Sequence, residues 1–222
     1  MIQANDNNSF VISYLNLRLG LGFVGFFLPI ILVAGSWGLA DCTQLQPSIS
    51  HYYYTIMGDY FVGSLCAVSM FLFFYKGLDK IDGFIANCAA ILALVVAFFP
   101  TNPSVDSVCQ YIYTNSNTPV NAVHYSAAAL LFASFAYFSI FLFTKTDPTK
   151  EMTPHKKMRN HIYVTCGSII IVCVALIAVY NFVGNLEIIL AKYKPTLILE
   201  SIALFAFGIS WITKGEMILK DV

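Results

Sequence analysis

The stretch Leu19–Ala40 reads LGLGFVGFFLPIILVAGSWGLA and contains no charged residue. A helix needs about 20 apolar residues to cross the hydrocarbon core of a bilayer, which is ~30 Å thick. A secretory signal peptide has a shorter apolar region of about 7–15 residues after a basic segment. Only Arg18 stands near the start of this stretch. The stretch therefore predicts a retained transmembrane helix over Leu17–Trp37.

Five further apolar runs have the length and composition of membrane spans. They are Tyr54–Tyr75, Phe84–Pro100, Val123–Thr144, His161–Val183 and Thr196–Thr213. The whole chain is 58% hydrophobic and 11% charged, whereas soluble domains are about 25% charged. The sequence predicts an all-α fold, a polytopic transmembrane six-helix bundle. We expect one domain over residues 13–222 after a flexible polar N-terminus over residues 1–12.

The distribution of lysine and arginine predicts the direction of the bundle. With the N-terminus in the cytosol, the cytosolic segments hold ten cations: Arg18, Lys76, Lys80, Lys145, Lys150, Lys156, Lys157, Arg159, Lys214 and Lys220. The three outer loops hold only Lys192 and Lys194. Cytosolic loops of membrane proteins carry such an excess. Both termini are therefore predicted to be cytosolic, and the expected location is a bacterial inner membrane.

The cysteines and the overall charge limit other functions. Net charge is +0, so nothing indicates a nucleic-acid partner. Four of the six cysteines fall in apolar runs, and there is no CxxC pair. Cys42 and Cys109 fall in the first two outer loops, where an oxidising compartment would allow a disulfide. Two unrelated thiols remain the alternative.

Ionisable residues within spans are costly and call for an explanation. Three such residues, Asp59, His124 and Glu200, fall near the predicted outer ends of spans two, four and six, and His51 lies just before span two. His51, Thr55 and Asp59 recur every four residues, so they would share one face if the helix reached back to His51. Ser48 and Tyr52 lie beside His51 in the sequence. We expect these residues to form a polar cluster.

Three interpretations of this cluster are open. The side chains could tie helix ends together, and a carboxylate such as Asp59 or Glu200 near a helix N-terminus is favoured by the helix dipole. They could hold the polar end of a lipid or small ligand. They could also bind a metal ion, because two imidazoles and two carboxylates suit zinc, and an open position on zinc activates water.

The cytosolic ends of the spans and the small residues in them favour structural roles. Lysines at cytosolic helix ends, including Lys156 and Lys214, are typical interface anchors. Glycines such as Gly22 and Gly208 favour close helix packing in a membrane. No repeat is evident.

Several short segments carry a family resemblance. They are SISHYYY (48–54), FVG (61–63), FFYKG (73–77), AFFPT (97–101), VHYSAA (123–128), FLFTKT (141–146), RNHIY (159–163), LES (199–201) and KGE (214–216). In these segments the chain resembles a bacterial family of six-span membrane proteins of unknown function. The resemblance covers nearly all of spans two to six and implies the same six-helix architecture.

Two more distant families share some of these features. A serine-rich loop before span two, a histidine at the start of span four and a glutamate early in span six occur in the same order in the DRAM/Sfk-type family, which this chain resembles. Some members of that family are tied to remodelling of GPI-anchor lipids. The likeness points to His124 and Glu200 as site residues. Ser48, His51 and Asp59 resemble the Ser–His–Asp set of the zinc-dependent alkaline ceramidases. This chain lacks their seventh span and HxxxH pair.

The sequence leads to one functional hypothesis and two alternatives. We expect an outward-facing pocket that binds or remodels a lipid or small amphiphile. The alternatives are a metal-dependent lipid hydrolase and a structural or accessory subunit without catalysis. Membrane lipids are the expected partners, and a homo-oligomer or a membrane-protein partner is left open.

Overall fold

The computed structural model describes residues 2–75, 77, 79–103, 109–112, 115–146, 149 and 151–219, without the side chains of residues 2–13, 187 and 188. All regular structure in this part of the chain is helical, as predicted. The α-helices are α1 (Ile2–Ala40), α2 (Gly58–Phe73), α3 (Lys80–Phe98), α4 (Thr118–Tyr137), α5 (Pro154–Phe182), α6 (Leu186–Leu190) and α7 (Pro195–Lys214). The shorter elements are the 3-10 helices η1 (Ser50–Tyr54) and η3 (Ala191–Tyr193) and the π-helix η2 (Phe138–Leu142).

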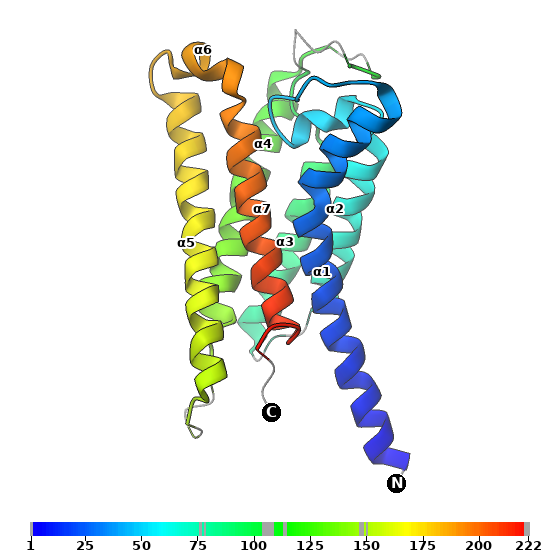
Figure 1. Cartoon of the computed structure of the whole chain (residues 1–222), viewed down its shortest axis with the longest axis vertical. Helices are drawn as coiled ribbons and strands as arrows, with labels where there is room; N and C mark the ends of the chain where they lie inside the picture. The colour runs from blue at the N-terminus through cyan, green and yellow to red at the C-terminus, as the bar shows by residue number, and fades with distance from the viewer. Residues whose placement is uncertain are drawn as a thin grey trace.

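The helices α1 to α5 and α7 form a closed ring. Each of α1 to α5 packs on the next helix in the chain, and α7 packs on both α5 and α1. Figure 1 shows these helices running side by side, with both chain ends at one end of the bundle and α6 at the other. We call the end with residues 41–57 and 184–194 the loop end, and the opposite end the termini end.

Five helices are long and apolar enough to cross a membrane. They lie over Tyr14–Ala40, Lys80–Phe98, Thr118–Leu142, Pro154–Phe182 and Ala191–Lys214. α2 is apolar but shorter, with 16 residues, which corresponds to about 24 Å of helix. Together these helices are those of a multi-pass membrane protein.

Several helix boundaries differ from the predicted spans. α1 begins at Ile2, well before the predicted start of the first span at Leu17. α5 begins at Pro154 instead of His161, because the Thr153 hydroxyl accepts a hydrogen bond from the Lys156 amide and caps the helix. The cations Lys156, Lys157 and Arg159 therefore lie in the first turns of α5 and not in a loop.

The second span does not reach back to His51. η1 ends at Tyr54, and α2 begins only at Gly58. Between them, the Thr55 hydroxyl donates to the Tyr52 carbonyl and accepts from the Met57 amide. This side chain thus takes the place of backbone partners, which breaks the helix. A Cβ at Gly58 would lie 2.3 Å from the Tyr53 carbonyl oxygen, so the break requires glycine there.

Glycines bring α1 and α7 together near the middle of the bundle. A Cβ at Gly208 would lie 2.8 Å from the Gly22 carbonyl oxygen, and a Cβ at Gly22 would lie 2.8 Å from the Ile212 amide nitrogen. The predicted packing role of these two glycines is thus confirmed.

A network of ion pairs lies at the termini end. Asp79 and Asp82 form a capping box at the start of α3, and the Lys145 ammonium lies 2.9 Å from Asp79 and 2.5 Å from Asp82. The carboxylates raise the pKa of Lys145. Lys76, Lys150 and Lys220, which the charge count also used, lie outside the described residues.

Candidate functional site

The polar residues at the loop end converge on one segment, residues 47–51, which lies between α4 and α7. Two bonds attach it to α7. The Leu197 amide donates to the Pro47 carbonyl at 3.1 Å, and the Ile49 amide donates to Glu200 Oε2 at 2.6 Å. Glu200, predicted from sequence as a site residue, therefore binds the backbone of this segment.

His124 on α4 holds the same segment from the other side. Its Nδ1 lies 2.7 Å from the Phe99 carbonyl oxygen, and its Nε2 lies 2.9 Å from Ser50 Oγ. The carbonyl can only accept, so Nδ1 must carry a proton. In the neutral ring, Nε2 is then the acceptor, and the Ser50 hydroxyl donates to it. His124 and Ser50 are both buried.

Ser48 and His51 form a second serine–histidine pair. Ser48 Oγ lies 2.6 Å from His51 Nδ1, and it also accepts a bond from the His51 amide at 3.3 Å. Which of these two atoms donates depends on the tautomer of the His51 ring. Burial, followed by the nearby His124 and Lys194, lowers the pKa of His51 to about 4. His51 is therefore neutral at pH 7.

A further polar layer surrounds this segment. The Tyr54 hydroxyl donates to the Thr101 carbonyl at 2.5 Å. Thr101 Oγ1 and the Asn102 amide both donate to Asn121 Oδ1, at 3.0 and 2.8 Å. The Tyr54 carbonyl accepts from the amides of residues 111 and 112. These bonds fix the segments that follow α3 and precede α4 against η1.

The predicted cluster is corrected at Asp59. Asp59 lies in the first turn of α2, and its side chain is exposed. The predicted face of His51, Thr55 and Asp59 does not exist, because the helix is broken between them. Tyr52 is fully buried and packs in the hydrophobic core, and burial raises its pKa.

The metal-site interpretation also fails on geometry. His51, Asp59, His124 and Glu200 are all among the described residues, where no group of three or more histidine, cysteine, aspartate or glutamate side chains could hold one metal ion. Instead, three of the four side chains bind hydroxyl and backbone groups of this chain: His51 to Ser48, His124 to Ser50 and Phe99, and Glu200 to Ile49.

Sequence reasoning missed the partners that complete the cluster. Ser50 is part of no sequence pattern that assigns it a role, and the Ile49 amide and Phe99 carbonyl are backbone groups that carry no side-chain signal. The proline after Phe99 was the available cue, since it ends α3 beside the start of α4.

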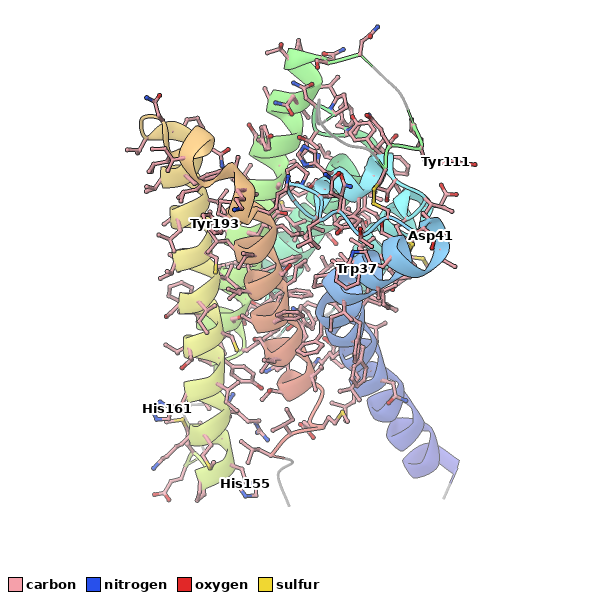
Figure 2. All side chains as sticks on the ribbon, turned by 45° about the horizontal axis from the view of Figure 1, so that its top comes forward. Trp37, Asp41, Tyr111, His155, His161 and Tyr193 are labelled. Atoms are coloured by element: carbon pink, nitrogen blue, oxygen red, sulfur yellow. A yellow bond between two sulfur atoms is a disulfide. The ribbon has the colours of Figure 1, made fainter. Side chains whose placement is uncertain are left out.

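A disulfide covers the loop end. Cys42, which follows α1, is bonded to Cys109, and their Cα atoms are 5.7 Å apart. Of the two alternatives left open by the sequence, the structure has the disulfide. Figure 2 shows a disulfide at the end of the bundle where Trp37, Asp41 and Tyr111 lie, far from His155 and His161.

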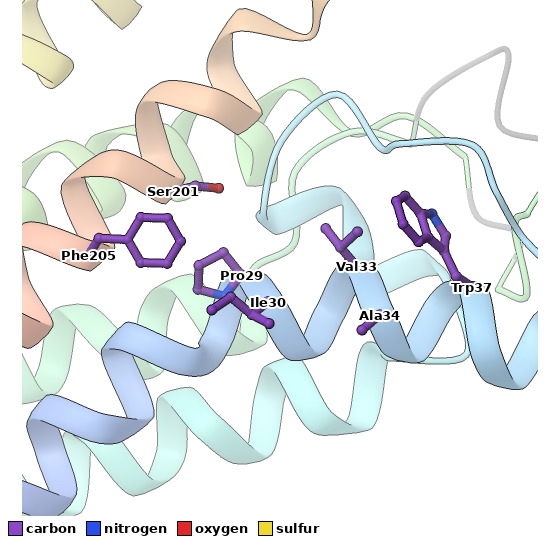
Figure 3. Close-up of a pocket in the computed structure, with 7 residues that line it drawn as sticks. All are labelled: Pro29, Ile30, Val33, Ala34, Trp37, Ser201 and Phe205. Carbon is purple, nitrogen blue, oxygen red and sulfur yellow. The ribbon is translucent and has the colours of Figure 1, made fainter.

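Two hollows lie near the segment. A small internal cavity of about 50 Å³ is lined mainly by apolar side chains, with Ser50 and Glu200 also on its wall. A larger groove of about 340 Å³ lies between α1 and α7. Figure 3 shows its lining residues: Pro29, Ile30, Val33, Ala34, Trp37, Ser201 and Phe205.

Comparison with known proteins gives no match: no family model, no curated protein sequence and no solved structure matches this chain.

Proposed function

We propose that this multi-pass membrane protein binds a lipid or another small amphiphile at the seam between α1 and α7. The apolar chain would occupy the groove of about 340 Å³, and the polar end would face the loop end. The observation that carries the proposal is a surface groove of this size with an apolar lining, next to the few polar groups that the chain places at helix ends.

The course of α1 and α7 supports this proposal. The two helices touch at Gly22 and Gly208, and Phe26 and Phe205 then pack with ring centroids 5.0 Å apart. Beyond these rings, toward the loop end, the groove begins at Pro29. Trp37 at the far end of the groove is 47% exposed, and tryptophan favours the headgroup level of a membrane.

Glu200 and Ser201 face the two different hollows, the internal cavity and the groove. They are successive residues of α7, so their side chains point about 100° apart. Ser201 lines the groove, and Glu200 lines the internal cavity and holds the Ile49 amide. A ligand in the groove would thus lie one residue away from the bond that fixes the segment 47–51.

Photocrosslinking tests the proposal. The protein is placed in nanodiscs that contain a phosphatidylcholine with a photoactivatable acyl chain. We expect crosslinks concentrated in residues 29–37 and 201–205. Ala34→Phe fills the groove and should remove them, whereas Ala178→Phe on the exposed face of α5 adds the same ring elsewhere and should not. Equal labelling of both variants and wild type would refute lipid binding in the groove.

The orientation and location complete the proposal. Ten of the twelve cations were assigned to the cytosolic segments, and both chain ends lie at one end of the bundle. We propose that the termini end is cytosolic and that the groove opens to the outer half of a bacterial inner membrane. A cysteine-labelling experiment in intact cells checks this, with labels placed at Lys192 and Lys157.

One observation favours a second function, acyl transfer. Ser50 donates to an imidazole whose other nitrogen is fixed by a carbonyl, which is the arrangement of a serine nucleophile and its general base. In the reaction, Ser50 Oγ would bond to the carbonyl carbon of an ester while its proton passes to His124. The proton would then leave with the alcohol, and water would release the acid.

A fluorophosphonate probe distinguishes this second function from the first. Covalent labelling of wild type but not of Ser50→Ala, with Ser48→Ala as the matched control, would support acyl transfer. Absence of labelling at Ser50 under conditions that label a known serine hydrolase would reject it and leave lipid binding in the groove untouched.

A further inference from the structure

A group of cations gathers at the termini end, away from the groove. Arg18 lies on α1, and Lys214 is the last residue of α7. Lys156 and Arg159 lie in the first two turns of α5. Arg18, Lys156 and Arg159 all act electrostatically on Lys214. We call these four residues the cation cluster.

Two ammonium groups of the cation cluster share one acceptor. Lys156 Nζ donates to the Phe143 carbonyl oxygen at 2.8 Å, and Lys214 Nζ donates to the same oxygen at 3.5 Å. Two cations bound to one oxygen repel each other where water is partly excluded. Anchoring at the interface explains why lysines occur here, but not why their charged groups meet.

Arg18 adds charge and an unused donor. Its Nη1 donates to the Lys214 carbonyl at 3.4 Å, while its Nε is buried and has no hydrogen-bond partner among the described residues. A buried donor without an acceptor is costly. Within the described part of the chain, Glu216 is the one carboxylate that acts on Lys214. The neighbouring Lys145, by contrast, has two aspartates of its own.

Aromatic rings flank the cation cluster. The Arg18 guanidinium lies 4.2 Å from the centroid of the Tyr14 ring, and Lys214 Nζ lies 5.4 Å from that of Phe143. The Tyr163 ring lies 5.7 Å from Lys156 Nζ and 6.0 Å from Lys214 Nζ. These rings limit hydration on one side of the cations, which strengthens the attraction for an anion on the other.

We propose that the cation cluster binds a phosphate group at the membrane surface, with Arg18 and Lys214 as its principal ligands. A phosphate offers several strong acceptor oxygens, which suit one guanidinium and one or more ammonium groups. The group would come from an anionic lipid or from free phosphate. The site is separate from the α1–α7 groove, and the proposal does not depend on lipid binding there.

The test uses the full chain in phosphatidylcholine nanodiscs, with the thermal unfolding midpoint and native mass spectrometry as readouts. The probes are dioleoyl phosphatidic acid, dioleoylglycerol with the same acyl chains, and inorganic phosphate. Phosphatidic acid at a hundredfold excess over Kd should raise the midpoint by about 5–11 °C, and dioleoylglycerol should not. Inorganic phosphate reproducing the rise would assign the site to a free anion. No effect of inorganic phosphate would assign it to the lipid.

Matched variants give the decisive comparison. Arg18→Gln/Lys214→Gln should lose the shift, whereas Lys192→Gln/Lys194→Gln, which removes two charges at the loop end, should keep it. The proposal is overturned if phosphatidic acid shifts the first variant as much as wild type, or if dioleoylglycerol acts equally.

A single substitution provides a test that still applies if the double variant does not fold. Lys214→Met keeps the apolar stem and removes one of the clustered charges, so its midpoint without anion should lie above that of wild type, and its response to phosphatidic acid should fall. A lower midpoint together with an unchanged response would also overturn the proposal.

Discussion

Replacement of Glu200 tests the central bond of the loop end. In Glu200→Ala, the Ile49 amide loses its acceptor at 2.6 Å and stays in a poorly hydrated place. A hydrogen bond to a charged group contributes about 1.5–3 kcal/mol, and a buried donor without an acceptor costs about 1–3 kcal/mol. We therefore expect the free energy of unfolding to fall by about 3 kcal/mol. In Glu200→Gln the amide oxygen can still accept, so we expect a loss of about 1 kcal/mol.

Two measurements check this prediction. Reversible unfolding in mixed detergent micelles gives the free energies, with Glu151→Ala, which removes an exposed carboxylate, as the control. Hydrogen exchange gives the local effect, because the Ile49 amide should lose protection in Glu200→Ala and keep it in Glu200→Gln. A Glu200→Ala protein within 0.5 kcal/mol of wild type, with Ile49 still protected, would show that the bond does not fix the segment.

Three further predictions follow from packing, titration and the disulfide. Gly208→Val should lower the free energy of unfolding by about 2 kcal/mol through overpacking, whereas Gly63→Val, where a Cβ meets nothing within 4 Å, should change it little in the same micelle assay. His51 has a folded pKa of about 4 against an ordinary value of 6.5. The unfolded state therefore binds more protons between these values, and stability should fall by about 3 kcal/mol as pH drops through this window; a pH titration of His51→Gln should show a smaller fall. Reduction of Cys42–Cys109 should cost about 2–4 kcal/mol, and a reductant that leaves the unfolding midpoint unchanged would contradict this.

The apolar runs predicted the helices because a membrane imposes a simple rule. Every backbone group in the hydrocarbon core must be bonded within the helix, so a run such as Leu19–Ala40 has only one viable structure. The disulfide was also within reach, since only Cys42 and Cys109 fell in polar outer loops. Both inferences depend on local composition alone.

The site needed information that local composition does not contain. The four-residue spacing of His51, Thr55 and Asp59 predicted one helix face, but the Thr55 hydroxyl competes with the backbone and ends the turn. The Ser50–His124 bond joins residues 74 positions apart, so it follows only from closure of the ring. The sequence predicted that His124 and Glu200 lie at the same end of the bundle, but it did not predict which groups they bind.

The seam between α1 and α7 also has a consequence for the order of synthesis. Of the described helices, α7 leaves the ribosome last, and it supplies the Leu197 amide and the Glu200 carboxylate that hold residues 47–51. Until α7 enters the membrane, α1 and α5 each lack one neighbour and the segment 47–51 lacks its acceptor. The loop end is therefore assembled late in biogenesis. Before that step, the uncovered sides of α1 and α5 would be exposed to membrane chaperones and proteases.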